Sequence, residues 1–219
     1  MGLPRLHVIT DDDVLAMPGF VQTAAHILAQ GATGIALHLR GHATSAALRY
    51  DHGVQLAAAA LRSGSWLLVN DRIDIAMAIR ANGVQLGIAA LPVVEARALL
   101  GAGARIGFSA HDTAAAVHAA VDGADFVLMG TIFESASHPG RGGTGVGALR
   151  ECAQRAGVPV LGIGGFTPRR VAAAAGAGAW GVAVLGGIWH AADPTKALTN
   201  YMTAVRDSFP AAAEQEQAV

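Results

Sequence analysis

The feature that most constrains the fold is an alternation of short apolar runs with longer, alanine-rich stretches. Each run is too short to form a stable helix and is largely apolar on both faces, as expected for a parallel strand that is covered on both sides. Eight such runs follow one another along the chain, at residues 6–10, 34–39, 66–70, 83–86, 105–109, 126–130, 159–163 and 181–185.

The stretches between the runs are rich in strong helix formers, for example at residues 46–62 and 113–121. Eight strand–helix units without a spare element predict an α/β fold, a single (β/α)8 TIM barrel. We place the barrel domain at residues 1–209 and expect a flexible tail at residues 210–219. Glycines that follow several predicted helices are expected to cap them with positive φ angles: Gly31, Gly64, Gly83, Gly123 and Gly157.

An open, doubly wound sheet is the main alternative fold. Such sheets have about five or six strands and a glycine-rich turn after the first strand. Here Asp11, Asp12 and Asp13 follow the first run, and no linker or change in composition divides the chain. The barrel is therefore the favoured fold.

The charge pattern argues against several kinds of partner. The net charge is −1, charged residues make up 14% of the chain and no basic stripe is visible, so we expect no nucleic-acid partner.

No uncharged apolar run reaches the roughly 20 residues that span a bilayer, and the first residues lack a targeting signal. We expect a cytoplasmic protein without a membrane partner, and the single Cys152 fits a reducing compartment as a small buried side chain. The oligomeric state is left open, a homo-oligomer included.

Polar residues gather where the first five runs end, which is where loops build the active site of such barrels. Arg40 lies between His38 and His42, and this arrangement argues against a metal site. Asp71 is equally suited to orienting a ligand and to capping the helix that follows it. The polar ends are Thr10-Asp11-Asp12, His38-Leu39-Arg40-Gly41-His42, Asn70-Asp71-Arg72, Gln85 and Ser109-Ala110-His111.

The last two strand ends carry glycine pairs instead, Gly164-Gly165 and Gly186-Gly187. Glycines let a phosphate approach backbone N–H groups, and loops seven and eight are the usual phosphate site of this fold. We predict a phosphate cup at these turns. The alternative is that the glycines serve only to make tight turns.

A long polar loop, residues 131–143, follows the sixth run. Long loops in compact domains are often functional, and Thr131, Ser135, Ser137 and His138 are candidate ligand contacts within it. The alternative is a solvated loop without a role in binding.

The order of the motifs along the chain is itself informative. The motifs are Ile-Thr-Asp-Asp, His-Leu-Arg, Asn-Asp-Arg-Ile-Asp-Ile-Ala, Gly-Val-Gln-Leu-Gly, Gly-Phe-Ser-Ala-His, Gly-Ala-Asp-Phe-Val-Leu-Met-Gly-Thr-Ile-Phe, Gly-Ile-Gly-Gly and Gly-Val-Ala-Val-Leu-Gly-Gly-Ile. From Leu6 to about Phe209 the chain resembles the thiamine phosphate synthase superfamily of barrels in thiamine biosynthesis. That superfamily contains a transferase, thiamine phosphate synthase, and an isomerase, the thiazole tautomerase often called TenI. The synthase joins a pyrimidine pyrophosphate to a thiazole phosphate and uses Mg²⁺.

Three segments depart from the synthase pattern. Residues 38–42 read His-Leu-Arg-Gly-His where the synthase has Gln-Leu-Arg-Glu-Lys. Residues 87–90, Gly-Ile-Ala-Ala, lack the Mg²⁺-binding Asp of the synthase, and residues 135–138, Ser-Ala-Ser-His, replace its Thr-x-Thr-Lys. Pyrophosphate and Mg²⁺ binding should both suffer, because histidine is largely uncharged at neutral pH and Asp71 alone makes a weak Mg²⁺ site.

We therefore expect a TenI-like thiazole tautomerase, an isomerase that acts on a thiazole carboxylate phosphate without a metal or other cofactor. Thr131 replaces the histidine that the resemblance implies after the sixth strand, so another acid or base must move the proton. The candidates are His138, which we favour, His111 and His38. For substrate binding the resemblance implies Arg40, Asn70, Ser109, Gly165, Leu185 and Gly186. The alternatives are a divergent, Mg²⁺-dependent thiamine phosphate synthase and a non-catalytic barrel that binds a phosphorylated ligand.

Overall fold

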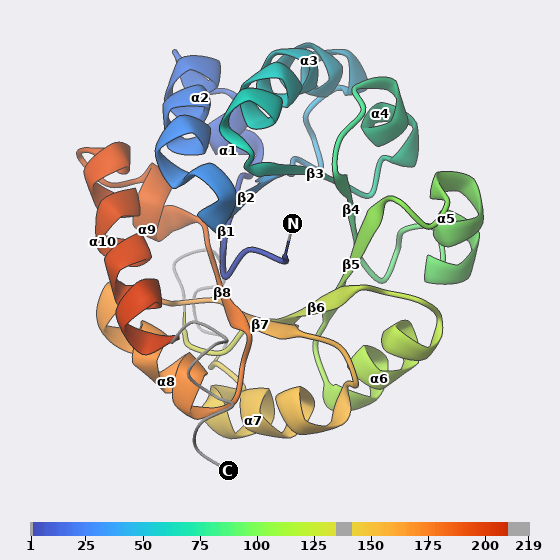
Figure 1. Cartoon of the computed structure of the whole chain (residues 1–219), viewed down its shortest axis with the longest axis vertical. Coiled ribbons are helices and arrows are strands. Elements are labelled where there is room, and N and C mark those ends of the chain that lie inside the picture. The colour runs from blue at the N-terminus through green and yellow to red at the C-terminus, as the bar shows by residue number, and fades with distance from the viewer. Residues whose placement is uncertain (1, 135–141, 210–219) are drawn as a thin grey trace.

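Eight parallel strands close into a barrel in the computed structural model, which describes residues 2–134 and 142–209 (Figure 1). Each strand pairs with the next, and β1 closes the sheet against β8. The predicted (β/α)8 barrel is confirmed, and each predicted strand end lies within one residue of the observed end. The strands are β1 (Leu6–Ile9), β2 (Ile35–Leu39), β3 (Trp66–Asn70), β4 (Gly83–Leu86), β5 (Arg105–Ala110), β6 (Phe126–Gly130), β7 (Val160–Ile163) and β8 (Gly181–Val184).

Helices surround the sheet on its outer side (Figure 1). The helices predicted at residues 46–62 and 113–121 are observed as α3 (Ala46–Ser63) and α6 (Thr113–Val121). Two short 3-10 turns, η1 (Ala32–Gly34) and η2 (Pro168–Arg170), join longer elements. The other helices are α1 (Asp12–Leu15), α2 (Phe20–Gly31), α4 (Ile73–Ala78), α5 (Val93–Leu100), α7 (Gly145–Arg155), α8 (Val171–Gly176), α9 (Gly186–Trp189) and α10 (Pro194–Ser208).

The predicted glycine caps are partly wrong. Gly64, Gly123 and Gly157 have the positive φ angles expected of such caps, 77°, 101° and 74°. Gly31 keeps the helical φ of −73° and remains inside α2. Gly83 belongs to β4, where a Cβ atom would overlap the backbone carbonyl of Arg105 on the neighbouring strand. Close approach of two strands, and not a helix end, explains that glycine.

The apolar side chains form one layer outside the sheet and a second cluster inside the barrel. Outward-facing strand residues such as Val8, Leu37 and Val84 pack against the helices. Cys152 lies fully buried in this layer, as predicted, and burial raises the pKa of its thiol to about 11. The inner cluster fills much of the barrel with Ile9, Ala36, Trp66, Leu68, Phe126, Leu128, Leu161 and Ala183.

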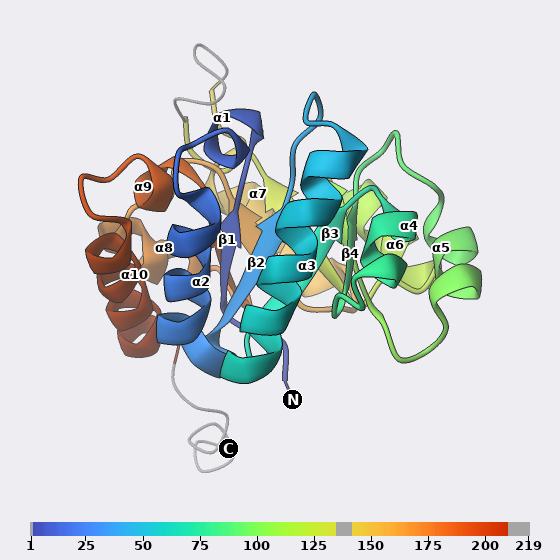
Figure 2. The ribbon, with the colours of Figure 1, turned by 90° about the horizontal axis from the view of Figure 1, so that it is seen from above.

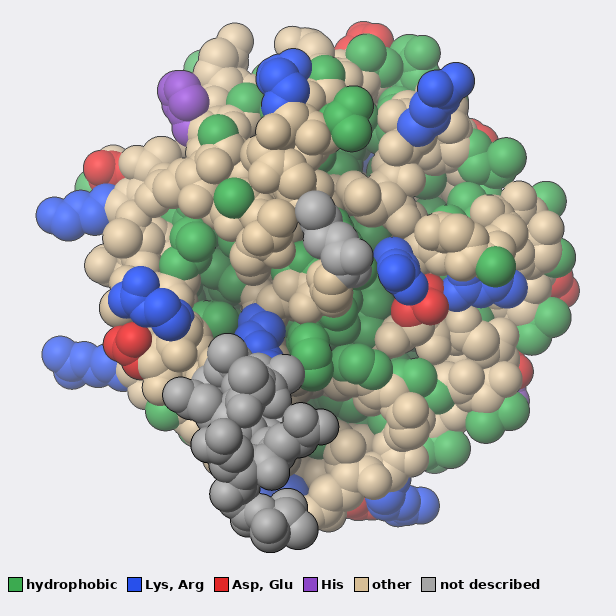
Figure 3. Space-filling view, in the orientation of Figure 1, with side chains coloured by type: hydrophobic (Ala, Val, Ile, Leu, Met, Phe, Trp, Pro, Cys, Tyr) green, Lys and Arg blue, Asp and Glu red, His purple; other side chains and the backbone are tan. Residues whose placement is uncertain are grey.

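The two ends of the barrel differ in role. In Figure 2, β1 rises from the N-terminus to α1, so the C-terminal strand ends and their loops lie at the top. We call this end the mouth and the opposite end the base. Figure 3 shows the face seen in Figure 1, on which Lys and Arg side chains lie singly or beside Asp and Glu and form no continuous stripe. No helix within the described part of the chain is long and apolar enough to cross a membrane.

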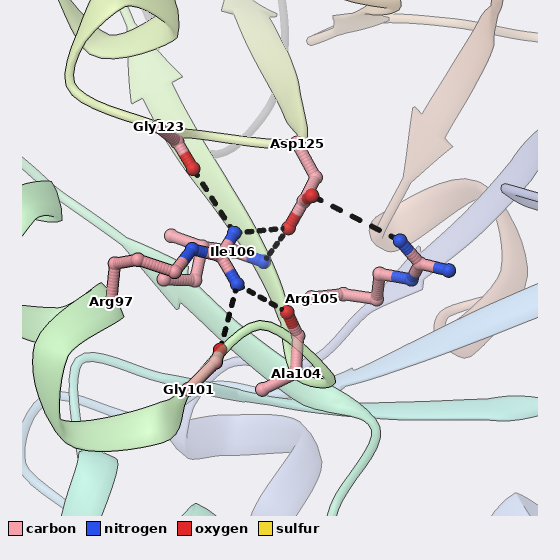
Figure 4. Close-up of polar contacts among 7 residues, drawn as sticks. All are labelled: Arg97, Gly101, Ala104, Arg105, Ile106, Gly123 and Asp125. Atoms are coloured by element: carbon pink, nitrogen blue, oxygen red, sulfur yellow. Dashed lines mark hydrogen bonds and ion pairs between the residues drawn. The ribbon is translucent and has the colours of Figure 1, made fainter.

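A half-buried ion pair braces the base between β5 and β6 (Figure 4). Asp125 accepts the backbone N–H of Ile106 and an N–H of Arg97, each at 2.7 Å. The Arg97 guanidinium also donates to the carbonyl oxygens of Gly101, Ala104 and Gly123. One guanidinium thus satisfies the carbonyl at the end of α5 and ties it to the start of two strands.

Candidate active site

Thr10, at the end of β1, fixes the start of the loop after β2. Its hydroxyl oxygen lies 3.0 Å from the His38 carbonyl oxygen and 2.8 Å from that of Arg40, and it accepts the Arg40 N–H at 2.8 Å. The half-buried Arg40 extends its guanidinium to His42, where Nη2 lies 2.8 Å from Nε2. Arg40, a predicted ligand contact, is therefore held at the mouth through its backbone.

Asp12 anchors the rest of the same loop. Its carboxylate accepts the backbone N–H groups of His42, Ala43 and Thr44, and also the Thr44 hydroxyl. The hydrogen bond from the Thr44 hydroxyl, followed by those from the backbone, lowers the pKa of Asp12 to about 2. The carboxylate is thus ionised and committed to the loop, which leaves it little capacity to bind a ligand.

Asp71 links the loops after β3 and β4. Its φ angle is 59°, and its Oδ1 accepts the Gly87 N–H at 2.8 Å. It does not cap α4, because the residue at that helix start is Arg72 and no side chain caps it. Neither role considered from the sequence accounts for this contact, which holds two neighbouring loops of the mouth together.

Five polar side chains lie in a row across the inside of the barrel, one on each strand from β1 to β5: His7, His38, Asn70, Gln85 and Ser109. His7 Nδ1 lies 2.8 Å from His38 Nε2, and Gln85 Nε2 donates to Ser109 Oγ at 2.9 Å. Four buried atoms of this row have no hydrogen-bond partner: His7 Nε2, His38 Nδ1, Asn70 Oδ1 and Gln85 Oε1. Because buried polar atoms are nearly always paired, this concentration suits a ligand with hydrogen-bonding groups of its own.

Burial keeps both histidines of the row neutral. It lowers the pKa of His7 to about 3, against a smaller opposing effect of the Pro4 carbonyl. It also holds the pKa of His38 well below the ordinary value, and the neighbouring His7 adds to the effect. The near-neutral titration assumed for His38 is therefore wrong, because its fully buried ring has no contact with water. His38 remains in the candidate site as a neutral hydrogen-bonding group.

Of the other predicted acids and bases, only His111 lies among the described residues, and it is not part of this row. His111 is exposed, donates from Nδ1 to the Gly130 carbonyl oxygen at 2.9 Å, and lines a cavity of about 430 Å³ between α6 and α7. Thr131 is half-buried, and its carbonyl oxygen accepts the N–H and the hydroxyl of Thr144. The predicted contacts Ser135, Ser137 and His138 lie outside the described residues and stay predictions.

The glycine turns after β7 and β8 have the open backbone that the predicted phosphate cup requires. Gly164 and Gly165 have φ angles of 100° and 64°, and a Cβ atom at Gly165 would overlap the carbonyl oxygen of Glu134. Leu185 precedes the short helix α9, which begins at Gly186. The first N–H groups of a helix have no acceptor within it, so these groups remain able to bind an anion. The cup itself stays a prediction.

Two residues of the mouth and barrel were not predicted from the sequence, His7 and Arg49. His7 lies between Leu6 and Val8, which face the helices, so strand alternation alone directs it into the barrel. Arg49 occupies the buried stripe of α3 with Gly53 and Leu56. An arginine on such a stripe is the signal that could have revealed it.

Comparison with known proteins agrees with this arrangement. The family model described as thiamine monophosphate synthase matches residues 6–188. The chain belongs to the thiamine monophosphate synthase family. A family relative named thiamine-phosphate synthase, from Salinispora arenicola, is 35% identical over 205 residues, which cover 93% of this chain and 98% of the relative. Another of the same name, from Methanoculleus marisnigri, is 41% identical over 151 residues, covering 68% and 70%. The solved thiamine phosphate pyrophosphorylase of Pyrococcus furiosus superposes with a TM-score of 0.81 at 28% identity, covering 94% of this chain and 97% of that one.

These findings overturn the expected tautomerase. The relatives, at about one-third identity over most of the chain, are named as synthases, which are transferases and not isomerases. The expectation rested on three short segments that depart from the synthase pattern, and one of them, residues 135–138, lies outside the described residues. Loop substitutions change without disturbing the barrel, so they are weak evidence against a relationship that extends over the whole chain.

Proposed function

We propose that this chain is a transferase of the thiamine-phosphate synthase type. It would join a pyrimidine pyrophosphate to a thiazole phosphate and release pyrophosphate. The observation that carries the proposal is the 35% identity to the Salinispora arenicola thiamine-phosphate synthase, across 98% of that protein. The family model, which matches residues 6–188, spans every strand end that contributes to the mouth, whereas the departures are confined to short segments.

The two halves of the mouth are consistent with two different ligands. The glycine turns at Gly165 and Gly186 suit the phosphate of the thiazole substrate, because they offer backbone N–H groups without side chains. The unpartnered atoms of His38, Asn70 and Gln85 suit a heteroaromatic ring with donors and acceptors at its edge. Neutral groups suffice for such a ring, and this agrees with the lowered pKa of His38.

The synthase resemblance implies Mg²⁺, and the described residues fit such an ion poorly. They contain no group of three or more His, Cys, Asp or Glu residues that could hold a metal ion. Asp71 already accepts the Gly87 N–H through Oδ1, and residues 88–90 bring no carboxylate. No step of the proposal is therefore assigned to a protein-held metal.

The test is to incubate the purified full-length chain with both substrates and to quantify the coupled product and pyrophosphate together. Equal amounts of the two are expected, measured once with added Mg²⁺ and once with a chelator. Replacement of Asn70 with Ala should lower the rate, whereas Asn200→Ala on the exposed face of α10 should not. If neither condition yields coupled product while thiazole phosphate still binds, the chain is the non-catalytic binding barrel instead.

A further inference from the structure

Arg49 is a buried cation at the mouth end of the barrel. It lies in the first turn of α3, the helix that follows the loop after β2, and only 9% of the residue is exposed. Figure 2 shows the start of α3 near the same end of the molecule as α1. An arginine buried to this degree is normally paired, because removing a guanidinium from water costs free energy.

Arg49 has no such pairing. Among the described residues its guanidinium makes no hydrogen bond or ion pair, and its Nε is fully buried without a partner. Neighbouring arginines differ in this respect, since Arg72 is bound to Asp74 and Arg40 to His42. Arg49 therefore retains its five N–H donors for another group.

The charges around Arg49 place it among the loops of the mouth. Burial is the main cause that lowers its pKa and Arg72 lowers it further, whereas Asp12, Asp71 and Asp74 raise it. Asp12 begins α1 just after β1, and the other three lie between the end of β3 and the first turn of α4. Asp12 is committed to the loop after β2 and Asp71 to Gly87, so neither carboxylate neutralises Arg49 by direct contact.

We propose that Arg49 binds the pyrophosphate group of the second substrate. This inference rests on the proposed transferase function and adds a residue to it. A guanidinium can bind two phosphate oxygens at once, and a phosphate oxygen is the strong acceptor that the buried N–H groups lack. The proposal also explains how the mouth tolerates the loss of the lysines implied by the synthase resemblance. The positive charge comes from helix α3 and not from the loops that have changed.

The test uses inorganic pyrophosphate as the probe and isothermal titration calorimetry at constant ionic strength. Arg49→Met should weaken pyrophosphate binding on the order of 10- to 100-fold, the value of a charged hydrogen-bonded pair. Arg49→Lys should retain part of the affinity. The matched control is Arg62→Met, which removes the same charge at the exposed C-terminal end of α3 and should leave binding unchanged.

Melting temperature separates this role from a purely structural one. If Arg49 is kept for a ligand, Arg49→Met removes an unpaired buried charge and should leave the melting temperature unchanged or raised. The proposal is overturned if Arg49→Met binds pyrophosphate as tightly as the wild type. It is also overturned if the loss of binding comes with a lower melting temperature in both Arg49 variants, or if the wild type does not bind pyrophosphate.

The binding test needs no turnover, so its result is independent of the proposed function. Arg49-dependent pyrophosphate binding without coupled product would sustain Arg49 as an anion ligand and refute the transferase. Coupled product with no effect of Arg49→Met on its KM for the pyrophosphate substrate would refute the role of Arg49 and leave the transferase standing.

Discussion

His7 Nδ1 and His38 Nε2 lie 2.8 Å apart inside the barrel, and neither ring is exposed to solvent. Both rings are neutral, so one nitrogen of the contact must carry the proton and the other must accept it. The tautomer of one ring therefore fixes the tautomer of the other. In the strand register His7 lies opposite Ala36, nearer the base than His38, so this bond links the lower part of the row to the mouth.

The buried His7 should make the protein sensitive to mild acid. Its pKa is about 3 when folded and near the ordinary 6.5 when unfolded, so below pH 6.5 the unfolded chain binds the extra proton. Above pH 6.5 His7 does not lower the free energy of unfolding. Between pH 6.5 and pH 3 this one group should lower it by up to about 1.4 kcal/mol per pH unit. Urea unfolding of wild type and His7→Phe between pH 7.5 and 4.5 measures the difference. The variant should show a shallower pH dependence than the exposed control His26→Gln, and equal slopes would contradict the prediction.

Gln85 should lower the stability of the fold and contribute to binding of the pyrimidine substrate. Its Oε1 is buried without a partner, while its Nε2 donates to Ser109. Gln85→Met should leave the melting temperature unchanged or raised, yet weaken binding of the pyrimidine substrate about tenfold, because a substrate hydrogen bond is lost. Gln55→Met on the exposed side of α3 is the matched control for the side-chain change. Unaltered substrate affinity in Gln85→Met would remove this residue from the candidate site.

Gly165 should be required in the phosphate cup both for its positive φ angle and for the lack of a side chain. Gly165→Ala combines a φ of 64° with overlap on the Glu134 carbonyl, whereas Gly178 has a φ of 79° and nothing within 4 Å of an added Cβ. Both alanine variants should lose about 1 kcal/mol from backbone strain. Only Gly165→Ala should also abolish thiazole phosphate binding, measured by calorimetry. Equal behaviour of the two variants would mean that strain alone accounts for the glycine.

The base should contribute stability without affecting ligands. Asp125→Asn weakens the bonds to Arg97 and Ile106 and should lower the free energy of unfolding by about 1–3 kcal/mol, the range for hydrogen bonds to a charged group. Arg155→Ala breaks an exposed pair with Glu151 and should cost less than about 1 kcal/mol. Urea unfolding gives both values, and calorimetry should show unchanged pyrophosphate affinity in both. A loss of affinity in Asp125→Asn would show that base and mouth are coupled.

The barrel could be predicted from the sequence because its signal is local and repeated. Each strand is a short run that is apolar on both faces, and the eight runs reinforce one another. The errors in the prediction have specific causes. Gly83 was interpreted as a helix cap, because the sequence does not show that Arg105 on the neighbouring strand approaches it closely. The Asp71–Gly87 contact likewise joins two loops 16 residues apart, which no local pattern reveals.

The candidate site was predicted only in part. Strand-end residues such as Arg40, Asn70 and Ser109 could be placed at the mouth because the fold directs those positions there, and their contact with a ligand stays a prediction. The contacts between these side chains could not be predicted. His38 is neutral because it is buried beside His7, and the pairing of β1 with β2 brings the two rings together. The enzyme type was wrong because it was judged from a few exchanged side chains, whereas the relatives are similar over the whole chain.

The pairing of β1 with β8 has a consequence for how the chain is made. The first strand emerges from the ribosome long before its partner, since β1 ends at Ile9 and β8 begins at Gly181. Until then one side of β1 is an open strand edge, which invites pairing with other chains. Nearly the whole polypeptide must therefore be synthesised before this edge is covered. A substitution that destabilises β8 should reduce the yield of soluble protein more than an equally destabilising substitution in a strand that does not close the barrel.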